Sequence, residues 1–210
     1  DGEAAGDYSG GSVSLSADGS IIAIGADSND GNGEGSGHVR IFKNSGTAST
    51  LTDSTITASA LNTLDTATIG AIDASSIQTI TGAIADINTA YTSSGITGLD
   101  NAAVTLSDAT ITASALNTLD TTRGGTIDVS SATTITGSIA DINTAYASSG
   151  ITGLDSAAIT LSDSTITATA LNTLDTAANG AIDASSVTTI TGSLTDINTA
   201  YASNGITGLD

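Results

Sequence analysis

Two kinds of apolar spacing alternate along residues 55–210. In the stretch TITASALNTLD, the residues Ala60, Leu61 and Leu64 lie on one face of a helix. After Gly70, the stretch AIDASS alternates apolar with polar residues, which is the spacing of a half-buried strand. This part of the pattern therefore predicts a helix, a turn and a strand.

The next part repeats that order with different residues. Ile84, Ile87 and Tyr91 stand at helical spacing, and GITGLD then supplies a glycine-punctuated turn. The stretch VTLSD alternates Val104 and Leu106 with polar residues. We again expect a helix, a turn and a strand.

Local chemistry marks the starts of some of these helices. Ser138 and Asp141, and equally Ser193 and Asp196, have the spacing of a capping box with Asp in place of Glu. The first copy has Ala83 at the serine position, which weakens its signal. Each predicted helix is only about ten residues long, too short to be stable alone in water, so packing on neighbours must hold it.

The pattern is tandemly repeated. GITGLD begins at Gly95, Gly150 and Gly205, which gives a 55-residue period. The opening TIT recurs at Thr55 and Thr79, so each unit divides into a shorter half-unit, such as 55–78, and a longer one, such as 79–109. The resulting units are repeat 1 at 55–109, repeat 2 at 110–164 and an incomplete repeat 3 at 165–210.

Short units with both helix and strand signals are typical of solenoids, in which each unit buries its apolar stripe against the next. We therefore expect a repeat protein, a β-rich α/β solenoid of stacked strand–short helix units. The rival arrangement is a string of independent domains, but a 55-residue unit without disulfides would be marginally stable. An open stack also exposes its last strands, so we expect further sequence or another subunit to cover them.

Residues 1–44 do not match the repeat. Alternating residues predict strands at Ser12–Leu15, Ile21–Ala26 and His38–Phe42, and thus an antiparallel β segment. Residues 45–54 are interpreted as a linker. The opening DGEAAGDYSGG has no secretion signal, so we expect a removed leader or an internal piece of a longer protein.

Composition excludes several functions. Three basic residues (Arg40, Lys43 and Arg123) face 22 acidic ones, and the formal charge of −19 argues against nucleic acid and anionic membranes as partners. The chain has no cysteine and one histidine, His38, which excludes thiol chemistry and multi-histidine metal sites. No stretch approaches about 18 consecutive apolar residues, so we expect no membrane insertion. Serines and threonines have no accompanying base, and we expect no enzyme activity.

The N-terminal strands carry a resemblance to a known family. The SVSLSADG hairpin, the IAIGA strand and the GHVRIF strand resemble one blade of an FG-GAP, or integrin-type, β-propeller. Acidic loops of such blades often bind calcium, which makes the glycine-rich run after the second strand a candidate calcium site. Its oxygen ligands would be Asp27, Asn29, Asp30, Asn32 and Glu34, and the alternative is a solvated acidic loop.

The tandem part resembles another group of proteins. The phrases ITASALNTLD and ADINTAYASSGITGLD are similar to repeats of very large secreted or surface-anchored proteins of marine cyanobacteria and similar bacteria. This resemblance implies an extracellular or cell-surface location and a role as a coat, adhesin, filament or motility-related layer.

Two recurring residue types bear on function. Aspartates recur at the repeat period and would form lines of like charge along a stack, which calcium could bridge. These lines are Asp53/Asp108/Asp163, Asp73/Asp128/Asp183 and Asp100/Asp155/Asp210. Burial of the recurring tyrosines Tyr91, Tyr146 and Tyr201 would favour a scaffold, whereas their exposure would favour a binding surface.

Taken together, these features predict a non-catalytic structural protein of the cell surface or extracellular space. Its repeat array would build a filament, fibre or surface layer by head-to-tail self-association. The alternatives are a calcium-dependent adhesin that binds cell-surface glycans and a phage fibre component.

Overall fold

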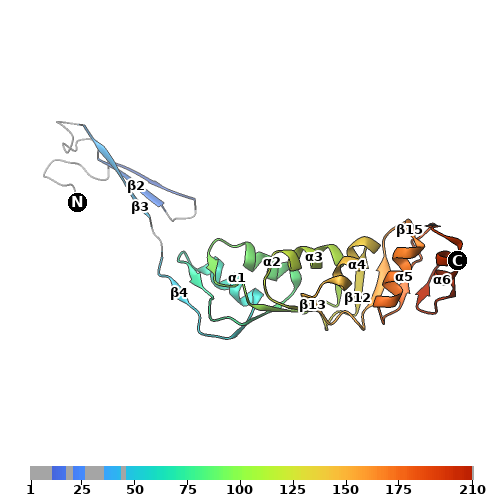
Figure 1. Cartoon of the computed structure of the whole chain (residues 1–210). Coiled ribbons are helices and arrows are strands. Elements are labelled where there is room, and N and C mark those ends of the chain that lie inside the picture. Colours follow the sequence, from blue (N-terminus) through green and yellow to red (C-terminus); the bar gives the residue numbers. More distant parts are fainter. Residues whose placement is uncertain (1–10, 18–20, 27–35, 44–45, 210) are drawn as a thin grey trace.

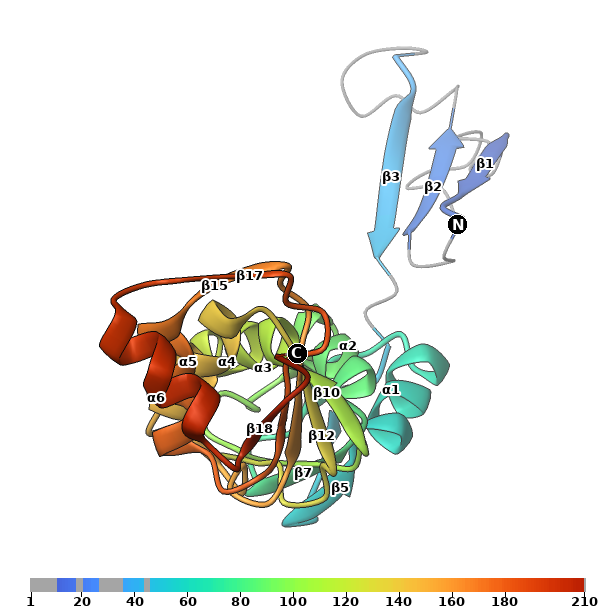
Figure 2. The ribbon, with the colours of Figure 1, turned by 90° about the vertical axis from the view of Figure 1, so that its right-hand side faces the viewer.

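The structure is a computed structural model that describes all residues except 1–10, 18–20, 27–35, 44–45 and 210. Residues 46–209 form an α/β fold of repeated strand–helix units with parallel sheets, as the hydrophobic spacing predicted (Figure 1). The helices follow one another in a row that winds about the long axis of this array (Figure 2). They are α1 (Ala58–Ala67), α2 (Ile84–Thr92), α3 (Ala113–Thr121), α4 (Ile139–Ala147), α5 (Ala168–Ala177) and α6 (Leu194–Ala202).

Short strands precede and follow each helix. Those before the helices are β5 (Thr55–Thr57), β7 (Thr79–Gly82), β10 (Thr110–Thr112), β12 (Thr134–Gly137), β15 (Thr165–Thr167) and β17 (Thr189–Thr191). Those after the helices are β6 (Ile72–Asp73), β8 (Ile96–Thr97), β11 (Ile127–Asp128), β13 (Ile151–Thr152), β16 (Ile182–Asp183) and β18 (Ile206–Thr207). A further strand type comprises β4 (Ser49–Thr50), β9 (Ala103–Leu106) and β14 (Ala158–Leu161).

Two five-stranded sheets form the body of the array. We call the sheet with the order β5-β7-β9-β11-β13 the first long sheet, and the sheet with the order β10-β12-β14-β16-β18 the second long sheet. Each long sheet takes three strands from one sequence repeat and two from the next. Neighbouring repeats therefore share hydrogen-bonded sheets, as in the bond from Val104 N to Thr126 O at 2.8 Å.

Aliphatic residues stack in register along each sheet. In the first long sheet, Ile80 faces Val104, Val104 faces Ile127 and Ile127 faces Ile151. The side chains of Ile80 and Ile127 are fully buried, as is Leu116 of α3. One continuous cluster of small and aliphatic side chains thus runs through the array and links the sheets to the helices.

The backbone conformation explains why the second glycine of GITGLD recurs in each repeat. Gly98 and Gly153 adopt φ values of +87° and +86°, a region that side chains disfavour. A Cβ atom on Gly153 would also lie only 2.6 Å from the backbone nitrogen of Ser130. Only glycine fits this close approach between adjacent turns.

The predicted helix caps at Ser138 and Ser193 are confirmed. The Ser138 hydroxyl accepts the Asp141 amide at 3.1 Å and donates to the Asp141 carboxylate at 2.7 Å. Ser193 makes the same two contacts with Asp196. At the start of α2, Ala83 provides no side-chain cap.

The N-terminal segment forms a separate antiparallel sheet in the order β1-β2-β3. Strands β1 (Ser12–Leu15) and β2 (Ile21–Ala26) have the predicted bounds, and β3 (His38–Lys43) extends one residue further. Both faces of this sheet carry exposed apolar side chains, including Val13 and Ile41.

The segment interpreted as a linker, 45–54, contributes a strand. Ser49 and Thr50 of β4 lie in parallel register with Ile72 and Asp73 of β6. Ser49 and Thr50 therefore belong to the sheets of the array. Within the described residues, no helix has both the length and the hydropathy needed to cross a lipid bilayer.

Candidate assembly surfaces

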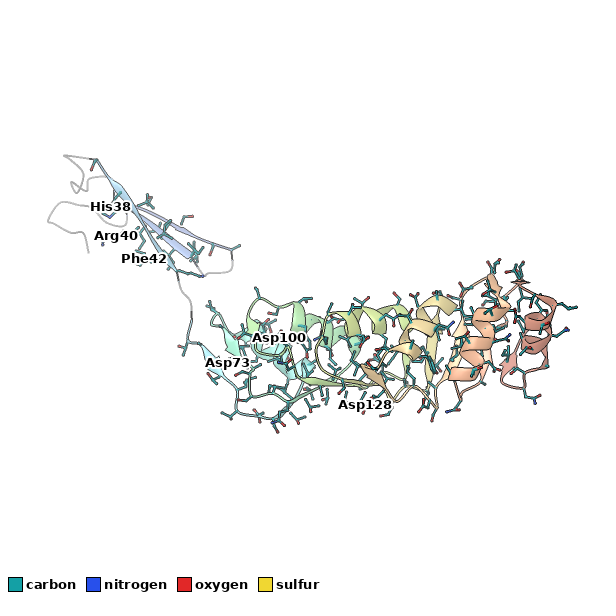
Figure 3. All side chains as sticks on the ribbon, viewed as in Figure 1. His38, Arg40, Phe42, Asp73, Asp100 and Asp128 are labelled. Atoms are coloured by element: carbon teal, nitrogen blue, oxygen red, sulfur yellow. The ribbon has the colours of Figure 1, made fainter. Side chains whose placement is uncertain are left out.

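The aspartates at the ends of β6, β11 and β16 do not form a line of like charges, contrary to the sequence prediction. Asp73, Asp128 and Asp183 belong to three different sheets, and Figure 3 shows Asp73 and Asp128 far apart along the array. Asp128 has a threonine on both sides in register, Thr105 and Thr152. The reason is that strands one full repeat apart in the sequence are not neighbours in a sheet.

These aspartates instead fix the turns that follow them. Asp73, Asp128 and Asp183 each accept the amide of the serine two residues later, at 2.9–3.0 Å. Hydrogen bonds from Ser75 lower the pKa of Asp73, and those from Ser185 lower the pKa of Asp183. These carboxylates have a structural task in turn formation.

A second set of aspartates caps helices across the array. Asp108, which follows β9, accepts the backbone amide of Ile84 at the start of α2 at 2.8 Å. Asp163, which follows β14, accepts the amide of Ile139 at the start of α4 at 2.7 Å. The sequence did not reveal these caps, because donor and acceptor lie far apart along the chain. Asp53 has the same place after β4, is exposed, and caps no helix in the described part of the chain.

The aspartates near the C-terminal ends of α1, α3 and α5 also have hydrogen-bond donors for their carboxylates. The hydroxyls of Ser93 and Ser148 donate to Asp65 and Asp120 at 2.7 Å, and that of Ser203 donates to Asp175 at 2.9 Å. The recurring serine two places before each GITGLD is the sequence signal for this contact. In the last predicted line, Asp100 and Asp155 are exposed, and Asp210 lies outside the described residues.

Two of the recurring tyrosines are built into the array. Tyr91 and Tyr146 are half-buried, and their hydroxyls donate to the carbonyls of Leu99 and Leu154 at 3.1 Å. Burial is the main cause that raises the pKa of both phenols. Tyr201 has the same position in the repeat, yet it is 57% exposed.

Residues 46–209 contain a single lysine or arginine, Arg123. Its guanidinium carbon lies 2.9 Å from the centre of the Tyr91 ring, in cation–π geometry. Burial lowers the pKa of this guanidinium, although the nearby Tyr91 opposes the effect. Arg123 thus covers Tyr91, whereas the equivalent position of the next repeat is Ala178.

The two ends of the array expose residues whose counterparts are covered. Leu194, at the start of α6, is 76% exposed, whereas Ile139 at the same position of α4 is 8% exposed. At the opposite end, Leu51 is half-buried, whereas its counterparts Leu106 and Leu161 are buried. Among the described residues, β17 and β4 are outer strands of the sheets at these two ends.

The candidate calcium ligands Asp27, Asn29, Asp30, Asn32 and Glu34 all lie outside the described residues. Among the described residues, no group of three or more His, Asp or Glu side chains is placed to hold a metal ion. His38 begins β3 and lies at one end of the N-terminal sheet (Figure 3). With Gly11, Ser12, Gly25 and neighbouring residues it lines a shallow hollow.

Comparison with models of protein families, with curated proteins and with solved structures found no match to this chain.

Proposed function

We propose that this protein is a non-catalytic structural component whose repeats form a continuous solenoid with a 55-residue period. The observation that carries this proposal is that both long sheets take strands from two adjacent repeats. A chain of independent domains has no such sheets. Shared sheets resist bending between repeats, because bending would strain the backbone hydrogen bonds between strands of adjacent repeats.

This architecture suits a protein whose task is to provide length. Each unit contacts only its neighbours, so added repeats extend the array without changing its cross-section. Leu194 is exposed at one end and Leu51 is half-buried at the other, and β17 and β4 are outer strands of their sheets among the described residues. These features support assembly of such arrays head to tail. A filament, fibre or surface layer follows from repeated end-to-end contact.

An extracellular or cell-surface location agrees with the sequence. The high negative charge suits a protein that works in salt water, where charge repulsion is screened within about 8 Å. The resemblance of the tandem part to giant bacterial surface proteins, and of the N-terminal sheet to an FG-GAP blade, leads to the same location. Calcium is the cation that we propose for the acidic, glycine-rich stretch of sequence from Asp27 to Glu34.

The environment of the tyrosines supports the scaffold over a glycan-binding adhesin. Tyr91 and Tyr146 use their hydroxyls within the chain, and their rings are half-covered. A sugar-stacking site needs an accessible aromatic face. The recurring tyrosines are therefore better explained as packing residues within the array than as a repeated binding surface.

Electron microscopy of the purified chain tests this function, with one sample in millimolar calcium and one in chelator at matched ionic strength. We expect fibres or sheets with a regular axial spacing, and loss of order in chelator if calcium stiffens the joints. Isolated flexible beads would contradict the continuous array. Short rigid rods that never associate would contradict self-assembly and leave a spacer or adhesive arm.

A further inference from the structure

The sheets at the two ends of the array are complementary fragments of one five-stranded sheet. Each long sheet begins with two strands that precede helices, continues with a strand of the β9 type and ends with two strands that follow helices. One end of the array has a two-stranded sheet, β15-β17, made of strands that precede helices. The other end has a three-stranded sheet, β4-β6-β8, made of the remaining types.

We propose that residues 47–54 of a second copy of this chain dock on β17 and α6, so that β15-β17 and the second copy's β4-β6-β8 form one sheet. This inference rests on the proposed head-to-tail assembly and specifies its joint. The order β15-β17-β4-β6-β8 would reproduce the order of strand types in both long sheets. The joint between copies would then be the same as the joint between repeats.

The register of this joint follows from the two long sheets. Val104 faces Ile80, and Ile159 faces Ile135. Ser49 has the repeat position of Val104, and Ile190 has that of Ile80, so Ser49 of the second copy would face Ile190 of the first.

Among the described strands, only β6 pairs with β4, so one side of β4 remains for this pairing. The amides of Ser49 and Leu51 already donate to Ala71 and Asp73 of the neighbouring strand at 2.9 Å. Neighbouring amides of a strand point to opposite sides, so the amide of Thr50 points to the open edge.

A helix cap would form at the same time. Asp108 caps α2 and Asp163 caps α4, each from the residue two places after a strand of the β9 type. At the corresponding place, Asp53 is an exposed acceptor, and the Leu194 amide at the start of α6 lacks such an aspartate among the described residues. Docking would bring the second copy's Asp53 to that amide, where the helix dipole also favours a carboxylate.

Side chains on the two surfaces match as well. Within the array, the Asn143 side chain of α4 donates to the carbonyl of Ala170 in α5 at 3.2 Å. Its counterpart on α6, Asn198, is exposed, and the counterpart of Ala170 is Ala60, an exposed residue of α1. Docking would also cover Leu194, a large exposed apolar residue of α6. The joint thus combines backbone pairing, a cap and apolar burial.

Two substitutions block the two surfaces separately. Thr50→Pro removes the amide that points to the open edge while β4 keeps its hydrogen bonds to β6. Leu194→Glu places a charge on the opposite surface, at a helix start that tolerates an acidic residue. Ala140→Glu is the matched control, since Ala140 is an exposed residue in the first turn of α4, away from both ends.

Sedimentation velocity over a range of concentrations tests the proposal with the full chain, after circular dichroism has shown that each variant is folded. We expect wild type and Ala140→Glu to form a series of oligomers. Thr50→Pro and Leu194→Glu should each remain monomeric, with association weakened roughly tenfold or more. An equimolar mixture of these two variants should form dimers and nothing larger, because it retains one intact pair of surfaces.

Other outcomes separate the inference from the proposed function. If wild type assembles and either variant assembles equally well, the joint lies elsewhere, and the inference fails while self-assembly stands. If the mixture of variants stays monomeric although wild type assembles, the inference fails in the same way. If wild type is monomeric at every concentration, both the inference and head-to-tail assembly fail.

Discussion

Removal of the Asp108 carboxylate should destabilise α2 more than the matching change destabilises α4. Asp108 accepts the Ile84 amide at 2.8 Å, and the helix has no cap of its own because Ala83 precedes it. In α4, by contrast, Ser138 provides a side-chain cap in addition to Asp163. The variant Asp108→Ala therefore leaves the start of α2 without any side-chain acceptor.

The size of the effect follows from the contact. Loss of a helix cap costs about 0.5–2 kcal/mol, and the short distance and full charge at Asp108 favour the upper half of that range. For a chain of this length, about 1 kcal/mol lowers the melting temperature by roughly 2–4 °C. Asp163→Ala should cost less, about 0.5–1 kcal/mol, because Ser138 remains.

Urea unfolding at low protein concentration, followed by circular dichroism, measures these differences. Asp53→Ala is the matched control, since Asp53 has the same repeat position but caps no helix of the described chain; its free energy of unfolding should stay within about 0.5 kcal/mol of wild type. Ala83→Ser should restore part of the loss in Asp108→Ala. Equal destabilisation by Asp108→Ala and Asp53→Ala would refute the assignment of Asp108 as a cap.

Three further predictions concern turns, tyrosines and assembly. Gly153→Ala should lower the free energy of unfolding in urea by about 1–3 kcal/mol, because Gly153 has φ +86° and no room for a Cβ atom. The control Gly124→Ala should leave the free energy of unfolding nearly unchanged, and similar losses in both variants would contradict the prediction. Burial raises the pKa of Tyr146 above its unfolded value of about 10, so the stability it provides is complete below that pH and is lost as pH rises through the raised pKa. Melting temperatures from about pH 9 to 12 should therefore fall more steeply in wild type than in Tyr146→Phe. Parallel plots of melting temperature against pH for the two proteins would contradict this role of Tyr146. Asp53→Asn should weaken self-association in sedimentation experiments without changing monomer stability, whereas Asp155→Asn, with the same loss of charge, should leave association unchanged.

Local structure was predictable from the sequence because its signals are local. The spacing of Ile84, Ile87 and Tyr91 identified α2, and Ser138 with Asp141 identified the start of α4. Strand bounds at Ser12–Leu15 and Ile21–Ala26 followed from simple alternation. In each case the residues that determine the element lie within a few positions of one another.

The pairing of strands was not predictable in the same way. The 55-residue repeat suggested that equivalent residues stack directly, which led to the wrong expectation of an Asp73–Asp128–Asp183 line. The longer part of each unit contains an additional strand, β9 or β14. Neighbouring strands in a sheet are therefore separated by less than half a repeat in the sequence, and each strand pairs with strands from other positions of the repeat. Side-chain contacts such as Asp108 with Ile84 depend on this register and could not be read from spacing alone.

The central claim is that adjacent repeats share sheets, and amide hydrogen exchange of the monomeric Thr50→Pro variant tests it most directly. The amides of Val104 and Ile159 lie near the end of one repeat and donate to Thr126 and Ala181 of the next, both at 2.8 Å. Shared sheets predict slow exchange at these two amides, comparable to that of Ile80 in the middle of a sheet. Fast exchange at Val104 and Ile159 beside a protected Ile80 would show that the repeats fold separately, and would contradict the continuous array.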